Sequence, residues 1–400
     1  MNLRAKIFDG HDALHWLAGL AIACGLMSSY IFTWNTGNRP WFEPRLAIDG
    51  PSYARDMVAL ASSSDFIHLN DLYHSPGYQV YLGCIDSVCG GQSVFRYIKL
   101  LAWILAALCM AMVFRLGEFR FGRHVGAVAA VLLAFSFKWK AYINLLQYEI
   151  PLAFVLTGLA FLFSWILPRT SRPDGPLTIL TGLVLAAACF LHFRFLLLVP
   201  LSAWSFWILR ADGLRRSKKA ACLVLFLSPP LLAVGCWSAY QTSRLGEAVV
   251  VQRIAPWSRQ FRLHNHLQAQ GFAYPYVESV EPSGWPFVAR KPGRYLQLIV
   301  ERFLYLWDFR KDIWYIGPSP SGFEYLFHLA ACLLFFAGVA LKLQVDLTSG
   351  LFRQNAIIYC IVSVALAGPI LSTGSSRFLV PILPLVCLFQ SYALVRAAAC

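Results

Sequence analysis

Several ionisable residues stand at the borders of apolar segments, where they could act together on one substrate. Asp49 opens the sequence Asp-Gly-Pro-Ser, and Glu149 begins an apolar run. The basic residues that border other apolar runs are Lys138, His192, Arg194 and Arg377. A carboxylate facing several cations suits the deprotonation of a hydroxyl group and the stabilisation of a leaving phosphate.

Each of these residues also has a simpler structural interpretation. Asp49 before Gly-Pro is an ordinary helix N-cap, and Glu149 followed by Ile-Pro suits a helix start. Lys138 can extend its ammonium group to the membrane interface, and Arg377 can pair with a lipid phosphate. The chemical interpretation is favoured because all of these residues are expected on the same side of a membrane.

The composition predicts the scaffold that would position them. Of the 400 residues, 58% are hydrophobic and 14% are charged, with a mean hydropathy of +0.57, which excludes a soluble multidomain enzyme. A membrane-spanning helix needs about 20 mostly apolar residues, so we expect an all-α, polytopic transmembrane bundle of about ten spans with interfacial helices on the outer face. The expected spans lie near 13–34, 97–114, 123–137, 148–167, 177–191, 195–209, 220–240, 323–341, 355–371 and 378–395.

The distribution of Lys and Arg predicts the orientation. These residues make up roughly one position in four of the short connections and about one in ten of the two long ones, 35–99 and 241–321. We therefore expect a cytoplasmic N-terminus and both long connections on the outer face. The short, inner segments would be 1–12, 115–124, 168–176, 210–219, 342–354 and 396–400.

This topology divides the chain into three regions. Residues 1–240 would form a transmembrane core whose first outer loop, 35–96, carries the chemistry. Residues 241–321 would form a second outer region rich in Arg and aromatic residues, and 322–400 would form C-terminal transmembrane helices. We expect an integral, multi-pass membrane protein with its site on the outer face. The sequence contains no N-x-[ST] glycosylation acceptor, which is compatible with a bacterial inner membrane.

The charge balance predicts anionic partners. With 34 Lys and Arg against 20 Asp and Glu, the net charge is +14. Membrane lipids or a phosphorylated ligand fit this excess. Nucleic acid is disfavoured because the chain contains no nucleic-acid motif. Most of the eleven cysteines fall in apolar runs, and whether Cys84 and Cys89 form a disulfide stays open.

The first outer loop contains further polar and aromatic candidates. Apolar residues recur at helical spacing over 52–61, which predicts a helix lying on the membrane surface with Asp49 at its start. Tyr53 lies on this helix, and His74 and Tyr78 follow in the sequence Tyr-His-Ser-Pro-Gly-Tyr.

Common cofactor and nucleophile motifs are missing from the sequence. It has no G-x-x-x-x-G-K-[ST], G-x-G-x-x-G, H-E-x-x-H or G-x-S-x-G motif. No cofactor is therefore implied. A divalent cation bound by Asp49, Asp56 or His74 stays open, because Mg²⁺ needs only one or two carboxylates.

The order of these features resembles the polyprenyl-phosphate-sugar glycosyltransferases of the GT-C class, especially the bacterial branch akin to protein O-mannosyltransferases and aminoarabinose transferases. The resemblance covers about 45–205 and 374–390 and is weak over 241–321. One departure is Asp49-Gly50, where the family frequently has Asp-Glu. The segments that carry the resemblance are IDGPSYARDMVALASSSDF, LYHSPGYQVYLG, FGRHVGAVAAVLLAFSFKWKAYINLLQYEIPLAF, GLVLAAACFLHFRFLLLVPL and SRFLVPILPL.

The resemblance implies transfer of a sugar from a polyprenyl phosphate to an acceptor hydroxyl of a glycan, lipid or protein, with inversion. Asp49 would be the general base, and Arg194 and Arg377 would hold the leaving phosphate. The other residues would bind substrate: His192 or Lys138 at the phosphate, Tyr53 and His74 at the sugar, Tyr78 at the start of a helix, and Glu149 orienting a hydroxyl or pairing with a cation.

Two other classes of function stay open at this point. A polysaccharide polymerase or ligase would place its chemistry on the Arg and His residues of 241–321. A transporter or flippase of lipid-linked sugars would bind the same substrate without reaction, although such proteins often show internal repeats and none is visible here.

Overall fold

A computed structural model describes residues 76–89, 94–143, 148–166, 175–209, 216–245, 292–307, 322–371 and 376–399, together with 19–20, 22–25 and 27. Every regular element within these residues is helical. The all-α fold class predicted from the sequence is confirmed. Asp49, Tyr53 and His74 lie outside the described residues, as does the surface helix expected over 52–61.

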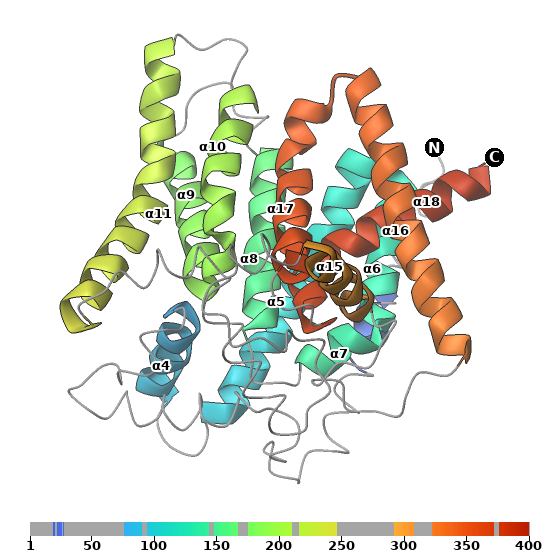
Figure 1. Cartoon of the computed structure of the whole chain (residues 1–400), viewed down its shortest axis with the longest axis horizontal. Helices are drawn as coiled ribbons and strands as arrows, with labels where there is room; N and C mark the ends of the chain where they lie inside the picture. Colours follow the sequence, from blue (N-terminus) through green and yellow to red (C-terminus); the bar gives the residue numbers. More distant parts are fainter. Residues whose placement is uncertain are drawn as a thin grey trace, which may run out of the picture.

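The helices follow the apolar runs of the sequence (Figure 1). The first half of the chain contains α4 (Gly77–Cys89), α5 (Val94–Leu116), the π-helical turn η3 (Gly117–Phe121), α6 (Arg123–Phe135), α7 (Phe137–Ile143), α8 (Glu149–Phe161), the π-helical turn η4 (Leu162–Ile166), α9 (Gly175–Leu191), the 3₁₀ turn η6 (Phe193–Leu197) and α10 (Leu198–Leu209). The second half contains α11 (Arg216–Leu245), α15 (Pro292–Leu306), α16 (Gly322–Thr348), α17 (Phe352–Leu371), the 3₁₀ segment η7 (Ser376–Ile382) and α18 (Leu383–Ala399).

Among the described residues, five helical segments are long and apolar enough to cross a membrane. Large apolar side chains such as Leu232 of α11 and Leu326 of α16 are two-thirds exposed, as expected of surfaces that face lipid. The chain is therefore an integral membrane protein. The five segments are Tyr97–Phe121, Arg216–Ser243, Gly322–Thr348, Phe352–Leu371 and Arg377–Ala399.

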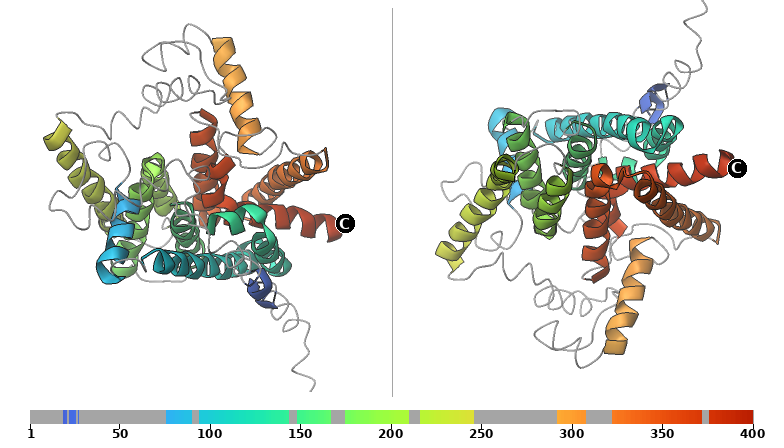
Figure 2. Two further views of the ribbon diagram at one scale, coloured as in Figure 1. Left: turned by 90° about the horizontal axis from the view of Figure 1, so that it is seen from below. Right: turned by 90° about the horizontal axis from the view of Figure 1, so that it is seen from above.

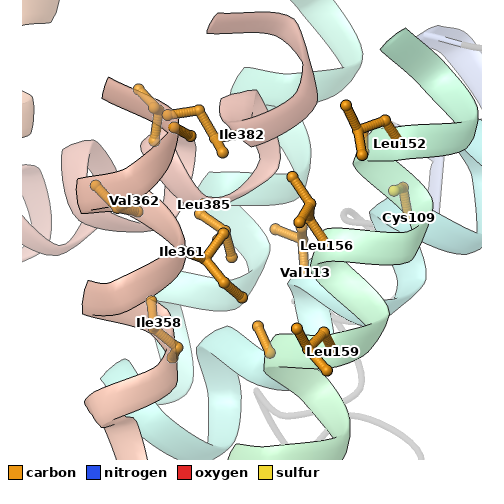
Figure 3. Close-up of a cluster of buried hydrophobic side chains, with 14 of the residues drawn as sticks. Cys109, Val113, Leu152, Leu156, Leu159, Ile358, Ile361, Val362, Ile382 and Leu385 are labelled. Atoms are coloured by element: carbon orange, nitrogen blue, oxygen red, sulfur yellow. The ribbon is translucent and has the colours of Figure 1, made fainter. Parts of the chain in front are cut away.

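Helix α8 forms the centre of the bundle. It is apolar on all sides, which is typical of a helix surrounded by other helices, and it packs against α5, α9 and η7. Figure 3 shows Leu152, Leu156 and Leu159 of α8 between α5 on one side and α17, η7 and α18 on the other. The first residue of α8 is thereby held at one end of a close-packed core.

The remaining helices flank this centre on two sides. Helix α9 packs along α11, and α18 packs against both α16 and α6. Helix α15 lies at the periphery, as the views along the bundle in Figure 2 show, and contacts α17 and η7. In Figure 1 the start of α8 and the ends of α9 and α17 lie at the lower end of the bundle.

The break expected between 191 and 195 is present, because α9 ends at Leu191 and η6 begins at Phe193. Two other segments differ from expectation. Helix α16 continues through the first part of the expected inner segment 342–354, and Lys342 and Asp346 are buried within it as an ion pair. The expected outer region 241–321 contains the regular helix α15 and the end of α11.

Most of the described cysteines behave as small apolar residues, as the sequence predicts. Cys24 and Cys236 are exposed, and Cys84 on α4 is exposed and free. The buried free cysteines are Cys109, Cys189, Cys222, Cys332, Cys360 and Cys387.

Candidate active site

A buried ion pair lies at the N-terminus of α8. Glu149, the first residue of α8, is fully buried, and its Oε1 lies 3.3 Å from Nε of Arg377 in η7. A carboxylate at a helix N-terminus is stabilised by the helix dipole. Pro151 fits the first turn because its missing N–H would have no intrahelical partner there. Of the two roles left open for Glu149, the structure shows pairing with a cation.

Tyr148, the residue before α8, joins this ion pair to nearby aromatic rings. Its hydroxyl accepts a hydrogen bond from Nη2 of Arg377 at 3.2 Å. Its ring centroid lies 5.3 Å from that of His192 and 6.3 Å from that of Tyr78. Because the hydroxyl oxygen accepts the bond from Arg377, the hydroxyl hydrogen can still be donated to a ligand.

The turn after α9 carries two further predicted residues. His192 has an extended backbone (φ −158°, ψ 116°), and its Nδ1 accepts a hydrogen bond from the backbone N–H of Arg194 at 3.2 Å. This bond occupies the lone pair of Nδ1, so a neutral His192 carries its hydrogen on Nε2. The histidine is thereby a defined donor.

One aromatic ring is shared by the two arginines. The guanidinium carbon of Arg194 lies 4.0 Å from the centre of the Phe378 ring, and that of Arg377 lies 5.3 Å from it. Such cation–π contacts attract the guanidinium groups to the ring and are stronger where these groups are desolvated. Two like charges in one partly buried place favour the binding of an anion between or beside them.

Two glycines allow the close approaches that the site requires. A Cβ atom on Gly368 of α17 would lie 2.7 Å from Cδ of Arg194, so the arginine stem lies directly against the helix backbone. A Cβ atom on Gly77 would lie 2.6 Å from the carbonyl carbon of Phe190. The absence of a side chain at Gly77 lets the start of α4 rest on the end of α9.

Tyr78 follows Gly77 and completes the aromatic side of the site. Its ring also stacks on that of Tyr81, with centroids 5.8 Å apart. Burial raises the pKa of Tyr78 well above its ordinary value, and the neighbouring Tyr81 and Glu149 act in the same direction. Tyr78 is therefore a neutral wall residue, unsuited to act as a base.

The structure brings together five of the residues that the sequence singled out. Lys138 is partly exposed on α7, a helix that packs against both α8 and η7. The predicted general base Asp49 and the predicted sugar-binding residues Tyr53 and His74 fall outside the described part of the chain. The five residues brought together are Tyr78, Glu149, His192, Arg194 and Arg377.

Sequence reasoning missed Tyr148, Phe378 and Gly368. The available signal was adjacency, because Tyr148 directly precedes Glu149 and Phe378 directly follows Arg377. Within the described ranges, no group of three His, Cys, Asp or Glu side chains is placed to hold a metal ion. The residues that left a divalent cation open, Asp49, Asp56 and His74, are outside those ranges.

The architecture around this site is shared with known structures. The Archaeoglobus fulgidus oligosaccharyltransferase in its apo form aligns with 100% of this chain at 12% identity and a TM-score of 0.57. The archaeal oligosaccharyltransferase AglB from the same organism, in complex with an inhibitory peptide and a dolichol-phosphate, aligns with 96% at 13% identity and a TM-score of 0.52. The chain has the fold of GT-C glycosyltransferases.

The similarity to these glycosyltransferases is one of three-dimensional structure, and it covers only part of their length. The chain spans 51% of the length of both oligosaccharyltransferase structures. ArnT from Cupriavidus metallidurans, bound to undecaprenyl phosphate, aligns with 86% of this chain and 55% of its own at 14% identity and a TM-score of 0.46. No family model and no curated protein sequence matches the chain.

Proposed function

We propose that the protein is a membrane glycosyltransferase that moves a hexosyl or pentosyl group from a polyprenyl-phosphate donor to an acceptor hydroxyl. The acceptor would be a glycan, a lipid or a protein on the outer face of a bacterial inner membrane. The observation that carries the proposal is the pair of guanidinium groups, Arg194 and Arg377, held on one Phe378 ring at the end of a GT-C fold. The dolichol-phosphate in the AglB complex supports a lipid phosphate as the ligand.

The charges of the described cluster fit the change in the donor during transfer. A sugar linked to polyprenyl phosphate is a phosphodiester with one negative charge, and the leaving polyprenyl phosphate gains negative charge as the bond to the sugar breaks. Two guanidinium groups against the single carboxylate of Glu149 leave a net positive site. Such a site stabilises the transition state more than the bound donor.

The proposed reaction is a single displacement at the anomeric carbon. Asp49 takes the proton of the acceptor hydroxyl, and the oxygen forms a bond to that carbon from the face opposite the phosphate. The bond between the carbon and the phosphate oxygen breaks, which inverts the configuration. Arg194 and Arg377 hold the leaving phosphate, with Nε2–H of His192 and the ammonium group of Lys138 as further donors, while Tyr53 and His74 line the sugar pocket.

The decisive experiment uses purified protein, a panel of polyprenyl-phosphate sugars and candidate acceptors, with and without Mg²⁺. Asp49→Asn should lower the transfer rate by about a hundredfold or more and leave donor binding intact, because it removes only the base. Asp71→Asn, in the same outer region, is the matched control and should retain native transfer.

Two results would contradict the proposal. Native transfer by Asp49→Asn would exclude Asp49 as the base, and a native protein that transports the lipid-linked sugar without transferring it would support a flippase. The proposed orientation is tested by labelling an Asp49→Cys variant in whole cells with an impermeant maleimide, which should react from the outside.

A further inference from the structure

Helix α15 lies beside the site and directs one charged side chain inward. Leu296 and Val300 are exposed on its outer face, and Tyr295 and Leu306 are buried on its inner face. Arg302 belongs to the same inner face and is fully buried. A fully buried arginine on an amphipathic helix is uncommon, because long cationic side chains usually reach solvent.

The guanidinium group of Arg302 binds the end of a neighbouring helix. Its Nη1 donates a hydrogen bond of 2.8 Å to the main-chain oxygen of Leu371, the last residue of α17. The last carbonyl groups of a helix have no partner within the helix and carry a partial negative charge. Arg302 therefore caps the C-terminus of α17 from another helix.

The capped turn is intrinsically weak. It contains Gly368 and Pro369, the two residue types with the lowest helix propensity. Pro369 also has no N–H to donate along the helix. A charged hydrogen bond from outside the helix compensates for this missing stabilisation.

The same turn supports both arginines of the site. The stem of Arg194 lies against Gly368, and Arg377 follows Leu371 closely in the chain. Helix α15 also packs against η7, which carries Arg377. A shift of this turn would therefore displace both guanidinium groups relative to Glu149.

We propose that Arg302 is a positioning residue, which caps the last turn of α17 and thereby holds Arg194 and Arg377 at the spacing that a lipid phosphate requires. This inference rests on the proposed function for its ligand. It gives the outer region 241–321 a role at the donor site, in addition to any contact with the acceptor.

The first test compares Arg302→Met, which keeps the length and apolar stem, with Arg302→Lys, which keeps one charged donor. Arg302→Met should raise the KM for the donor and lower kcat/KM by about tenfold, the effect of losing one charged hydrogen bond. Arg302→Lys should recover most of this loss. The KM for the acceptor should stay native in both variants. A general loss of folded protein would lower the apparent kcat and leave the KM for the donor unchanged, so the rise in donor KM separates the two cases.

A second substitution tests the route through the turn. Pro369→Ala restores an N–H and raises helix propensity, so it should recover transfer and undecaprenyl phosphate binding in the Arg302→Met background. Pro229→Ala in α11 is the matched control, since Pro229 also lies inside a helix and α11 does not carry the site residues. It should give no recovery.

Amide hydrogen exchange separates this inference from the proposed function, because it needs no substrate. Arg302→Met should speed exchange over 368–371 and 376–379 and leave α9 and α18 protected. Unchanged exchange there, or equal rescue by both proline substitutions, would overturn the positioning role. A native protein that binds undecaprenyl phosphate without transferring sugar would overturn the transferase proposal, while the effect of Arg302→Met on that binding would still decide the inference.

Discussion

Tyr148 connects the charged and aromatic sides of the site through one hydroxyl group. Tyr148→Phe keeps the ring contacts with Tyr78 and His192 and removes the oxygen that accepts a hydrogen bond from Arg377. Loss of a hydrogen bond to a charged group costs about 1.5–3 kcal/mol. We therefore expect kcat/KM for the donor to fall about tenfold or more, measured by transfer from the polyprenyl-phosphate sugar.

The chain supplies a matched control for this substitution. The hydroxyl of Tyr392 on α18 accepts a hydrogen bond from Nε of Arg396 at 3.3 Å, away from the site. Tyr392→Phe should transfer sugar at the native rate. Equal losses in the two variants would mean that the Tyr148 hydroxyl acts through stability and has no special role at the donor.

At this scale the sequence predicted the charged residues of the site and Tyr78, and it missed the aromatic residues Tyr148 and Phe378. Charged residues make up only 14% of the chain, so Glu149, Arg194 and Arg377 stand out beside long apolar runs. The chain has 30 Phe and 17 Tyr, so nothing in their type distinguishes Tyr148 or Phe378. Their roles come from contacts between distant segments, such as the one that joins Tyr148 to Arg377.

The elements were predictable where apolar runs are long and uninterrupted. The break at His192 was visible because two polar residues interrupt the run. The end of α16 was not, because Lys342 resembles the end of a span in the sequence, whereas Asp346 one turn later neutralises it inside the helix. Helix α15 was missed because its inner face includes Arg302, a charged residue at a buried position.

Gly368 links an element to the site, because α17 must lack a side chain where Arg194 crosses it. In Gly368→Ala the new Cβ atom would lie 2.7 Å from Cδ of Arg194, so the guanidinium group must move. A misplacement of about 1 Å at a reacting group can cost about a hundredfold in rate. We expect a loss of this order in transfer, together with weaker binding of undecaprenyl phosphate.

Gly235 of α11 is the control for this change, since a Cβ atom there meets nothing within 4 Å. Gly235→Ala should keep native transfer, and its thermal unfolding midpoint in detergent should be equal or higher, because Ala favours a helix by about 1 kcal/mol over Gly. If Gly368→Ala also kept native transfer, the position of Arg194 would not limit the reaction.

The two ends of the bundle balance charge in different ways. At the end that carries the site, Arg377 pairs with Glu149 and Arg194 adds a second guanidinium group on the Phe378 ring, which leaves a positive excess for a ligand. Elsewhere, between α16 and α17, the carboxylate of Asp346 accepts hydrogen bonds from Lys342, Asn355 and Tyr359, so its bonding capacity is used within the protein. The first arrangement suits a substrate, and the second suits the joining of helices.

The Lys342–Asp346 pair should therefore affect stability and leave the site chemistry unchanged. Asp346→Leu leaves the ammonium group of Lys342 buried without its carboxylate, which costs about 3–5 kcal/mol for a buried pair. Lys342→Met combined with Asp346→Leu removes both charges, so the double variant should unfold in detergent at a higher temperature than the single variant. Both variants should bind undecaprenyl phosphate with native affinity at temperatures where they remain folded.

Two outcomes would contradict this prediction. Equal unfolding temperatures for the single and double variants would show that the pair contributes no coupling energy. Weakened lipid binding in both variants would show that this part of the bundle is coupled to the site.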